Sequence, residues 1–424
     1  MNSISIDNQK FGKRRCNDWL DSFSKRVVFS MLKKLTIGHL TLEDQGLFYE
    51  FGEPKDSARY HAHIHIHDKG AYRDIFLNST IGSGEAYMKG WWTSPDIVAV
   101  IRLMVANLSV LYDMNAKRPI WRRIGAKITH KFNGNSQCGS RKNISAHYDL
   151  GNDFFSLFLD SSMMYSAAVY PEKDASLEVA AVNKLDRICQ KLRLSPTDHL
   201  LEIGTGWGGM AMHAAQNYGC KVTTTTISKE QYEFTKARVE AAGLSDQVTL
   251  LLEDYRDLTG VYDKLVSIEM IEAVGHEYYD SYFSQCSRLL KPHGMMVIQA
   301  ITIADQRYDY ARRSVDFIQR YIFPGGCLPS NQVIAEKIAK KTDMQIIELE
   351  DITEHYAKTL ADWRARFHDA RREVIDLGFD DVFFRMWDFY LAYCEGGFKE
   401  RVISTSQFVF VKPNYRFTLA SAYY

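Results

Sequence analysis

The segment from Leu200 to Met210 is the most informative part of the sequence, because an apolar strand there ends in a carboxylate and breaks into glycines. The carboxylate is Glu202, and the glycines are Gly204, Gly206, Gly208 and Gly209. Glycine permits a tight turn and close backbone approach, and a helix that starts near Trp207 would direct its unpaired N–H groups toward a bound ligand. The spacing departs from the G-x-G-x-x-G pattern of dinucleotide sites. We therefore expect the turn to bind S-adenosylmethionine, whose charged end is an α-amino acid group, rather than a pyrophosphate.

The ends of the next two predicted strands add polar groups to this turn. The segment 223–228 has no carboxylate that could bind ribose hydroxyls, so we expect hydroxyl and backbone contacts there, from Thr226, Ile227 and Gln231. The third strand ends in Asp254 and Tyr255, where a carboxylate can accept the adenine amino hydrogen and an aromatic ring can cover the base. Each motif alone is compatible with a purely structural role. Together they describe one cofactor site at the carboxyl edge of a sheet.

Strand-like and helix-like segments alternate through the C-terminal part of the chain. The predicted strands are 200–203, 221–227, 248–252, 264–268 and 295–301, and the predicted helices are 210–217, 229–241 and 279–290. This alternation indicates a parallel sheet with right-handed crossovers. Strands near 345–350 and 407–411 complete it. The predicted fold class is therefore α/β, a Rossmann-like domain of the class I S-adenosylmethionine methyltransferase type with a smaller N-terminal α+β domain.

The length of 424 residues suggests two or three domains. We expect an N-terminal domain at 1–120, with strands at 46–51 and 59–68 and a helix at 96–113. A polar, basic and glycine-punctuated linker follows at 121–142, and the catalytic domain covers 143–424. An aromatic, helical insertion at about 303–400 would form a substrate lid or an acyl pocket in that domain.

Composition excludes several classes of protein. The formal net charge of zero argues against a general nucleic-acid binder, which needs a basic excess to neutralise phosphates. The seven cysteines are scattered, odd in number and form no C-x-x-C pair, which fits a reducing cytosol. We find no N-terminal signal-like apolar segment and no apolar run of about 18 residues. We therefore expect a cytoplasmic protein that is not integral to a membrane.

Basic and apolar residues alternate from Lys10 to Lys34, as in a cationic amphipathic helix. The basic residues are Lys13, Arg14, Arg15, Lys25, Arg26, Lys33 and Lys34, and the apolar ones include Trp19, Phe23 and Phe29. One interpretation is attachment to an anionic membrane surface. The commoner alternative is a helix packed on its own domain with a solvated basic face.

Four histidines alternate with apolar residues in the strand-like segment 59–68. They are His61, His63, His65 and His67, and the period of two places them on one face. Two such histidines could chelate a metal, but no carboxylate or cysteine stands at partner spacing nearby. We therefore expect an exposed strand face and no metal site.

Several long motifs, in order along the chain, resemble the cyclopropane-fatty-acyl-phospholipid synthase family. They are His147–Phe155, Met164–Ser166, the glycine turn, Glu272–His276 and Tyr321–Pro329. In the N-terminal domain, Gly82–Trp91 is similar to the family's entry module. The resemblance covers nearly the whole chain.

The resemblance implies an activity and residue roles. Members of the family move the methyl group of S-adenosylmethionine onto the cis double bond of an acyl chain within a phospholipid. The alkene is the nucleophile, so the protein must orient it, exclude water and remove a proton to close the ring. Tyr165 and Ser166 would hold the methionine end of the cofactor with the glycine turn. Glu272, Tyr356 and the backbone near Ile301 would hold a bicarbonate that acts as the base.

Two positions depart from the family's pattern. Ala167 stands where many members have cysteine, and Gln299 stands where many have histidine. Gln299 can donate a hydrogen bond but cannot carry charge, so proton removal and the end product could differ. Cys394 matches a family cysteine that is sometimes treated as catalytic. The mechanism needs no thiolate, so we expect Cys394 to be a buried residue that lines the pocket.

We therefore expect an enzyme that forms cyclopropane fatty acyl groups on unsaturated phospholipids of a bilayer, peripherally associated with the inner face of the cell membrane. The alternatives are a branched or methylene product, methyl transfer to a small soluble molecule, and a non-catalytic lipid-binding relative. Intact Gly204, Gly206, Asp254, Glu272 and Tyr356 favour an enzyme, because a protein without cofactor chemistry has no need of them all. Nucleic acid is not an expected partner, and a homodimer is left open.

Overall fold

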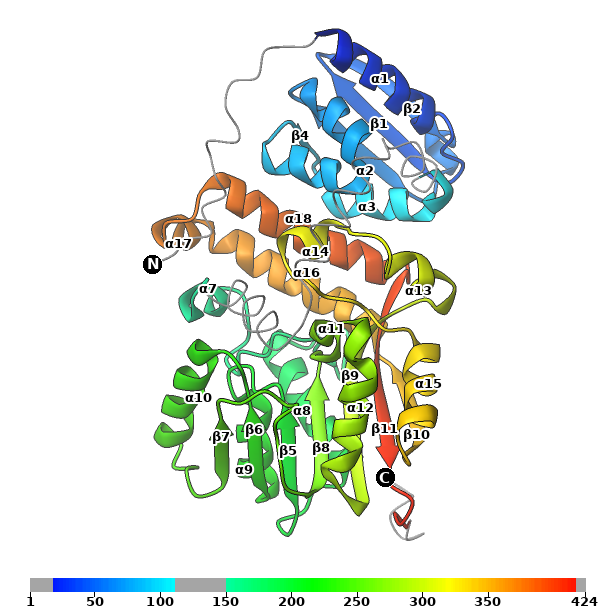
Figure 1. Cartoon of the computed structure of the whole chain (residues 1–424). Helices are drawn as coiled ribbons and strands as arrows, with labels where there is room; N and C mark the ends of the chain where they lie inside the picture. Colours follow the sequence, from blue (N-terminus) through cyan, green and yellow to red (C-terminus); the bar gives the residue numbers. More distant parts are fainter. Residues whose placement is uncertain (1–17, 111–149, 417–424) are drawn as a thin grey trace. The chain divides into compact units, whose positions relative to one another are not determined.

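The structure is a computed structural model, and it describes residues 18–110 and 150–416. The chain divides into two compact units (Figure 1). The first unit contains Met1–Ile128 and Val374–Glu400, and the second contains Thr129–Glu373 and Arg401–Tyr424. The expected linker and residues 10–17 of the basic stretch lie outside the described residues.

The first unit is built on a four-stranded sheet with the order β2-β1-β3-β4. Its strands are β1 (His39–Asp44), β2 (Leu47–Gly52), β3 (His61–Ile66) and β4 (Trp92–Thr93). β1 and β2 form an antiparallel hairpin whose turn residues, Gln45 and Gly46, both have positive φ, 57° and 77°. Positive φ at both central residues is what a two-residue hairpin turn requires. β2 and β3 confirm the two strands that were predicted here, whereas β1 was not predicted.

Among the described residues, the first unit contains the helices α1 (Asp18–Leu32), α2 (Gly70–Met88), α3 (Ile97–Ala106) and α18 (Asp381–Lys399). α18 follows the catalytic part of the sequence, yet it packs against α2 and α3. Gly396 permits this closeness, because a Cβ there would lie 2.6 Å from Ile101 Cγ2. Tyr87 also donates a hydrogen bond from its hydroxyl to Asp388 Oδ2 at 2.5 Å. The structure therefore places 374–400 in the first unit, not in the catalytic domain to which the sequence pattern assigned it.

The histidine face of β3 has a neighbour that the sequence pattern did not reveal. The rings of His63 and His65 stack with centroids 4.1 Å apart. Glu43 on β1 lies beside them, with Oε2 2.7 Å from His65 Nδ1 and 3.9 Å from His63 Nε2. Parallel pairing of β1 with β3 brings Glu43 opposite His65 although 22 residues separate them in sequence. The carboxylate of Glu43 thus lies close enough to share a metal ion with the two histidines. The reason for expecting no metal here, the lack of a nearby carboxylate, therefore does not hold in the structure.

The second unit contains a seven-stranded sheet with the order β10-β11-β9-β8-β5-β6-β7. Its strands are β5 (His199–Ile203), β6 (Lys221–Thr225), β7 (Val248–Leu251), β8 (Tyr262–Ile268), β9 (Leu290–Ile303), β10 (Gln345–Asp351) and β11 (Ile403–Val411). The strands from β5 to β9 pair in parallel, while β11 runs antiparallel to both β9 and β10. Every strand predicted for this part is present, which confirms the α/β fold class. The sheet is mixed rather than wholly parallel, because β11 enters it in the opposite direction.

Helices connect these strands, and several begin at the residue types that cap helices. They are α7 (Asn152–Ser156), α8 (Leu177–Leu192), α9 (Gly209–Tyr218), α10 (Lys229–Ala241), α11 (Ile271–Val274), α12 (Tyr279–Arg288), α13 (Asp305–Ala311), α14 (Phe317–Tyr321), α15 (Asn331–Lys341) and α16 (Thr353–Asp369), and α17 (Arg371–Asp376) spans the boundary between the units. Ser176, Ser228 and Ser330 each accept a backbone N–H bond at the start of α8, α10 and α15. Among the described helices, none is long and apolar enough to cross a membrane.

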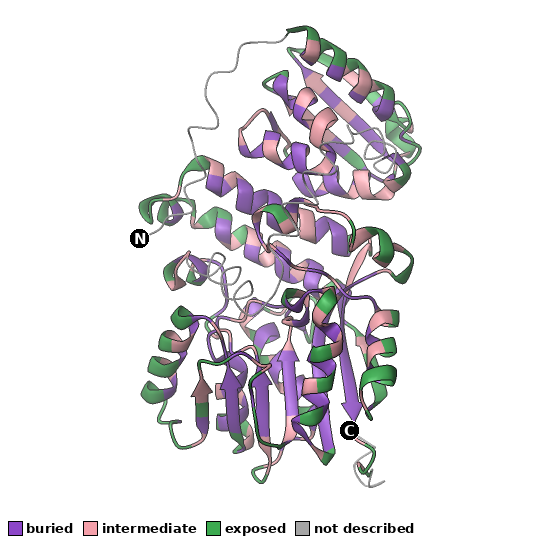
Figure 2. Ribbon diagram, viewed as in Figure 1, coloured by how far each residue is buried: buried purple, intermediate pink, exposed green. Residues whose placement is uncertain are grey.

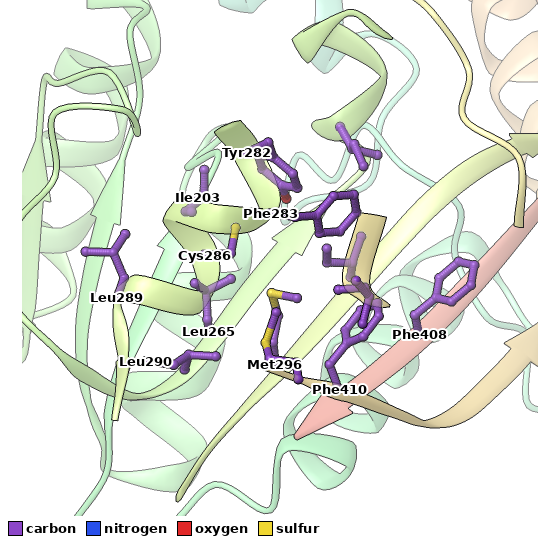
Figure 3. Packing of buried hydrophobic residues seen from close by; sticks show 14 of the residues in the cluster. Ile203, Leu265, Tyr282, Phe283, Cys286, Leu289, Leu290, Met296, Phe408 and Phe410 are labelled. Atoms are coloured by element: carbon purple, nitrogen blue, oxygen red, sulfur yellow. The ribbon is translucent and has the colours of Figure 1, made fainter. Parts of the chain in front are cut away.

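Side chains of the central strands alternate between two core layers, since successive strand residues point to opposite faces of a sheet. On one face, Leu265 and Met296 pack with Phe283 and Cys286 of α12 (Figure 3). On the other face, the adjacent strand residues pack with α8 and α9. Because both faces are covered, the carboxyl ends of the strands are where this sheet can present polar groups to a ligand.

Candidate active site

β5 ends in the predicted glycine turn, and three of its glycines have positive φ: Gly204 at 102°, Gly206 at 54° and Gly208 at 86°. At Gly206 an added Cβ would meet no atom within 4 Å. At Gly208 it would lie 2.6 Å from Thr235 Cγ2, so this glycine lets the turn pack against α10. Gly206 is therefore the position where a ligand can approach the backbone, and Gly208 has a packing role.

Partly accessible residues gather at the carboxyl ends of neighbouring strands, although most of the sheet interior is buried (Figure 2). They are Gly204 and Gly206 after β5, Ile227 after β6, Ile268, Glu269 and Met270 at the end of β8, and Ile301 in β9. Ser267 and Ala300, next to them in β8 and β9, are fully buried. The accessible surface thus lies at the edge where α/β sheets bind ligands.

A turn at 160–164 positions Tyr165 and Ser166. The carboxylate of Asp160 accepts hydrogen bonds from Ser162 N at 2.8 Å and from Met164 N at 3.1 Å. The ring of Tyr165 then packs against Trp363 of α16, with centroids 5.3 Å apart. These contacts hold the backbone just before the Tyr165–Ser166 pair, which was expected to bind the methionine end of the cofactor, and fix the ring of Tyr165.

Lys184 is a buried cation that the sequence analysis did not identify. It lies on α8, and its Nζ donates a hydrogen bond to Ser166 Oγ at 2.9 Å. Loss of hydration lowers the pKa of Lys184 to about 8, while the carboxylates of Glu269, Asp160 and Glu202 oppose this shift. Because Ser166 Oγ accepts a hydrogen bond from the ammonium group, the hydroxyl hydrogen of Ser166 can be donated to another acceptor.

Glu202 is buried at the end of β5. Its Oε2 accepts a hydrogen bond from Thr224 Oγ1 at 2.6 Å, and Thr224 Oγ1 lies 2.7 Å from Thr205 Oγ1. Desolvation raises the pKa of Glu202 to about 8, against the opposing effects of Thr224 and Lys184. The carboxyl group is thus linked to the glycine turn through two threonine hydroxyls.

The residues expected at the next two strand ends are in place, and each has a partner within the protein. Thr226 Oγ1 donates to Gln231 Oε1 at 2.8 Å, so these two form one polar pair after β6. Asp254 is buried and paired with Arg256, whose Nε and Nη2 donate to its two carboxylate oxygens at 2.8 Å and 2.7 Å. The ring of Tyr255 packs against Tyr282, with centroids 5.4 Å apart. Arg256 orients the carboxylate that was expected to bind adenine.

Trp207 is 2% exposed, and its indole N–H donates to Asn152 Oδ1 at 2.6 Å. Its ring packs against Phe155, with centroids 4.9 Å apart. The side chain of Trp207 thus ties the glycine turn to α7. The cofactor contact expected from the backbone N–H groups near Trp207 stays a prediction.

A second polar cluster lies at the ends of β8 and β9, with Glu269 at its centre. Glu269 Oε1 accepts hydrogen bonds from Ala167 N at 2.9 Å and from Gln299 Nε2 at 2.8 Å. Glu269 Oε2 accepts one from the hydroxyl of Tyr356, on α16, at 2.8 Å. Three residues expected around the base, Ala167, Gln299 and Tyr356, are therefore brought together. The residue that joins them, Glu269, was missed, although a carboxylate directly after the fourth strand of the alternating pattern was a usable signal.

Glu272 and Ile301 form the adjoining part of this cluster. Glu272 Oε1 accepts a hydrogen bond from Ile301 N at 2.5 Å, whereas its Oε2 is inaccessible and has no hydrogen-bond partner among the described residues. Desolvation and, second, the charge of Glu269 together raise the pKa of Glu272 to about 8. The backbone oxygen of Glu272 accepts from Cys327 N at 2.8 Å, which ties the Tyr321–Pro329 motif to the site.

Cys394 belongs to a helix of the first unit. It lies on α18 in the first unit and is partly exposed rather than buried. The expectation that Cys394 is a buried residue is therefore wrong. The sequence could not show this, because the packing of α18 on α2 and α3 depends on contacts between distant segments.

Carboxyl groups outnumber the ammonium group among the titratable side chains at this edge. Lys184 interacts electrostatically with Glu202 and Glu269, and Glu269 interacts with Glu272. A ligand with a net positive charge would favour the ionised form of these carboxyl groups. S-adenosylmethionine, which combines a sulfonium with an amino acid group, carries such a charge.

Fold and site together define a class I S-adenosylmethionine-dependent methyltransferase. The family model for mycolic acid cyclopropane synthetase matches residues 135–408, so the chain belongs to this family. It is a C-methyltransferase that uses S-adenosylmethionine.

Relatives of known description support this assignment. The chain is 37% identical over 396 residues to the tuberculostearic acid methyltransferase of Mycobacterium tuberculosis, covering 91% of each chain. It is 38% identical over 351 residues to the cyclopropane-fatty-acyl-phospholipid synthase of Escherichia coli strain K12, covering 82% of this chain and 87% of that protein. Among solved structures, a mycolic acid cyclopropane synthase complexed with SAH and CTAB is 33% identical, with a TM-score of 0.60, over 64% of this chain and 98% of that one.

Proposed function

We propose that this enzyme transfers the methyl group of S-adenosylmethionine to the cis double bond of unsaturated acyl chains in membrane phospholipids and forms cyclopropane fatty acyl groups. The observation that carries the proposal is the meeting of two clusters at one sheet edge. Gly206 leaves room for a ligand after β5, and Glu269 gathers three donors after β8. β5 and β8 are neighbours in the sheet, so the two strand ends are adjacent.

This arrangement suits an alkene as the methyl acceptor. The alkene itself attacks the methyl carbon, so the protein needs no nucleophilic side chain and acts by orienting the reactants and excluding water. S-adenosylmethionine, when bound, supplies the electrophilic methyl group. The ring of Tyr165 packs against Trp363 and Phe323, with Tyr165 to Phe323 centroids 6.4 Å apart, and Tyr165 and Phe323 both stay partly accessible beside Ser166. Apolar surface of this kind accommodates an acyl chain.

Bicarbonate is not part of the proposal, because the residues present do not fit it. The resemblance assigned it to Glu272, Tyr356 and the backbone near Ile301. In the structure, the hydroxyl of Tyr356 binds Glu269 and the N–H of Ile301 binds Glu272. The chain's own carboxylates thus use the donors that a bicarbonate would need.

A phospholipid bilayer as the source of the acyl chain is supported by the name of the Escherichia coli relative, a cyclopropane-fatty-acyl-phospholipid synthase, and by the surface of α1. Trp19 is 74% exposed and Phe23 is 40% exposed, and their rings stack with centroids 5.8 Å apart. Arg26, further along the helix, and Lys33, directly after its end, line a groove that Lys69 also lines. Exposed aromatic rings beside cations are typical of helices that bind anionic bilayers. We propose peripheral attachment of this kind to the inner face of the cell membrane.

Two observations favour a product other than a cyclopropane ring: the glutamine at position 299 and the name of one relative. Gln299 cannot take up charge, so loss of the proton from the cation need not follow the route of members that have histidine. The relative that matches 91% of the chain is named for tuberculostearic acid. The alternative product is therefore a branched or methylene acyl chain.

Expression of the full chain in a bacterial host that lacks its own synthase tests both products. Mass spectrometry of the extracted phospholipids should show unsaturated acyl chains that have gained one CH₂. Resistance of the product to catalytic hydrogenation under mild conditions indicates a ring, whereas uptake of hydrogen indicates a methylene group. Phospholipids identical to those of the empty host would contradict the proposed function.

A further inference from the structure

The backbone at Glu269 adopts a conformation that a glutamate rarely adopts. Its φ is 49°, in the left-handed region that favours glycine. The backbone N–H of Glu269 donates to Gln299 O at 2.7 Å, which fixes the residue directly after β8. A strained non-glycine residue at the carboxyl edge of a sheet points to a functional requirement for its side chain.

The carboxylate of Glu269 occupies the centre of the donors that surround the reaction's base. The N–H of Ala167, the amide of Gln299 and the hydroxyl of Tyr356 come from three separate parts of the chain, and all donate to it. A glutamate carboxylate and a bicarbonate share the same planar O–C–O acceptor group. We propose that Glu269 is the catalytic base of this enzyme and replaces the bicarbonate that the family resemblance implied. This inference rests on the proposed function.

The proton transfer balances without any further reactant. The alkene forms a C–C bond to the methyl carbon while the S–CH₃ bond breaks, which leaves neutral S-adenosylhomocysteine and a carbocation. The Glu269 carboxylate then takes a proton from that cation, and the C–H electron pair closes the ring or forms a double bond. The neutral Glu269 carboxyl group afterwards releases the proton to water.

Two neighbouring carboxyl groups are available, and their surroundings favour Glu269 as the base. Glu269 has three donors and the ammonium group of Lys184 to stabilise its anion. Glu272 has one backbone donor, an unpartnered Oε2 and the Glu269 charge beside it. When two carboxyls interact, the better stabilised one ionises and the other keeps its proton. Glu272 is thus the neutral partner at neutral pH.

Desolvation raises the pKa of Glu269, while hydrogen bonds from Gln299, Ala167 and Tyr356 oppose the shift. A carboxylate with a raised pKa is a stronger base than an exposed glutamate. Glu269 as a residue also keeps part of its surface accessible, and a base that must reach a substrate requires access of this kind.

The test compares purified full chain, Glu269→Ala and Glu269→Gln in buffer freed of carbon dioxide, with unsaturated phospholipid vesicles as substrate and with or without added bicarbonate. The wild type should turn over equally well in both buffers. Glu269→Ala should lose at least about a hundredfold in kcat and keep its affinity for S-adenosylmethionine, and bicarbonate should restore part of the activity. Glu269→Gln fills the same space with an amide, so bicarbonate should not rescue it. Glu233→Ala, an exposed change on α10, is the matched control and should behave as the wild type.

The outcomes separate this inference from the proposed function. A wild type that methylates vesicles only with bicarbonate, or a Glu269→Gln variant with near wild-type kcat, would overturn the role of Glu269 and leave the function intact. A wild type that binds S-adenosylmethionine but methylates no acyl chain in either buffer would overturn both. Circular dichroism of each variant checks the fold, and retained cofactor affinity shows that the loss is catalytic.

Discussion

Gln407 on β11 donates a hydrogen bond from Nε2 to the side-chain oxygen of Gln299 on β9 at 3.0 Å. The two residues are paired directly across the antiparallel ladder. Because the oxygen of Gln299 accepts from Gln407, its Nε2 faces the other way and donates to Glu269 and to Ala167 O. One buried amide thus sets the orientation of a second amide, which in turn holds the base.

Replacement of Gln407 should therefore affect turnover more than cofactor binding. In Gln407→Ala the Gln299 amide loses its orienting partner, and we expect kcat to fall about tenfold, corresponding to roughly 1.4 kcal/mol. The affinity for S-adenosylmethionine should stay within about threefold of the wild type. Steady-state kinetics and calorimetry measure the two quantities. Gln216→Ala, an exposed change on α9, is the control, and an equal fall in kcat for both variants would contradict the orienting role.

Gly206 should be required for cofactor binding. A valine there would place its side chain in the space beside the turn, and we expect Gly206→Val to abolish measurable binding of S-adenosylmethionine. Gly243 offers a matched control, because it also has positive φ, 68°, and its Cβ would also meet nothing within 4 Å. A side chain at either position causes a backbone strain of about 1–3 kcal/mol. Because this strain is common to both variants, a loss of S-adenosylmethionine binding in Gly206→Val alone would report on the ligand site. Calorimetry that shows unchanged affinity in folded Gly206→Val would refute the site assignment.

The sheet of the second unit could be predicted from the sequence because its signals are local. Apolar runs such as 264–268 alternate with helical patterns, and the glycine turn marks the edge where ligands bind. Gln299, Ala167 and Tyr356 were found through the family resemblance, and the structure joins them through one carboxylate. Local patterning and motif order were therefore sufficient for the fold class and for most of the base cluster.

The remaining features depend on contacts between distant segments. α18 belongs to the first unit because Gly396 and Asp388 meet α3 and α2, which no local pattern shows. Lys184 looks like any helix lysine in sequence, and only the packing of α8 buries it. Glu43 comes beside His65 only through the pairing of β1 with β3. These features could therefore be identified only from the tertiary structure.

The stability of the protein should depend on pH through Glu272. Its pKa is about 8 in the folded protein, against 4.5 for an unperturbed glutamate. The folded carboxyl therefore keeps a proton that the unfolded chain releases, so stability falls as pH rises from about 4.5 to about 8. Glu272→Gln cannot titrate and should show a shallower decline in the free energy of unfolding, measured in urea at several pH values. Glu233→Gln should keep the wild-type slope, and an unchanged slope in Glu272→Gln would contradict the raised pKa.

Glu272 and Glu269 should also differ in catalysis. Glutamine mimics a neutral carboxyl group, so Glu272→Gln should lower kcat far less than Glu269→Gln if Glu272 is the protonated partner. A typical loss of a positioned base is about a hundredfold or more. The measurement is the ratio of kcat for Glu272→Gln to kcat for Glu269→Gln in the same vesicle assay. A larger loss in Glu272→Gln would assign the base to Glu272 instead.

Bilayer attachment should depend on the exposed face of α1. Charge reversal in Arg26→Glu with Lys33→Glu should weaken binding to anionic vesicles at least about tenfold, since each basic residue near the surface contributes about 1 kcal/mol. Lys229→Glu with Lys236→Glu, exposed on α10, makes the same charge change elsewhere and should have little effect. Vesicle co-sedimentation measures both, and the wild-type interaction should weaken with salt. Equal loss in the two double variants would indicate a nonspecific charge effect.

In the proposed function, the transferred methyl group becomes part of an acyl chain at its double bond. Purified enzyme, vesicles of unsaturated phospholipid and S-adenosylmethionine with a CD₃ methyl group test this directly, with mass spectrometry of the released fatty acids as the readout. We expect acyl chains that have gained one carbon and retain a CD₂ group, because one deuteron passes to the base. Recovery of unmodified acyl chains, with the label in another product or still in the cofactor, would contradict it.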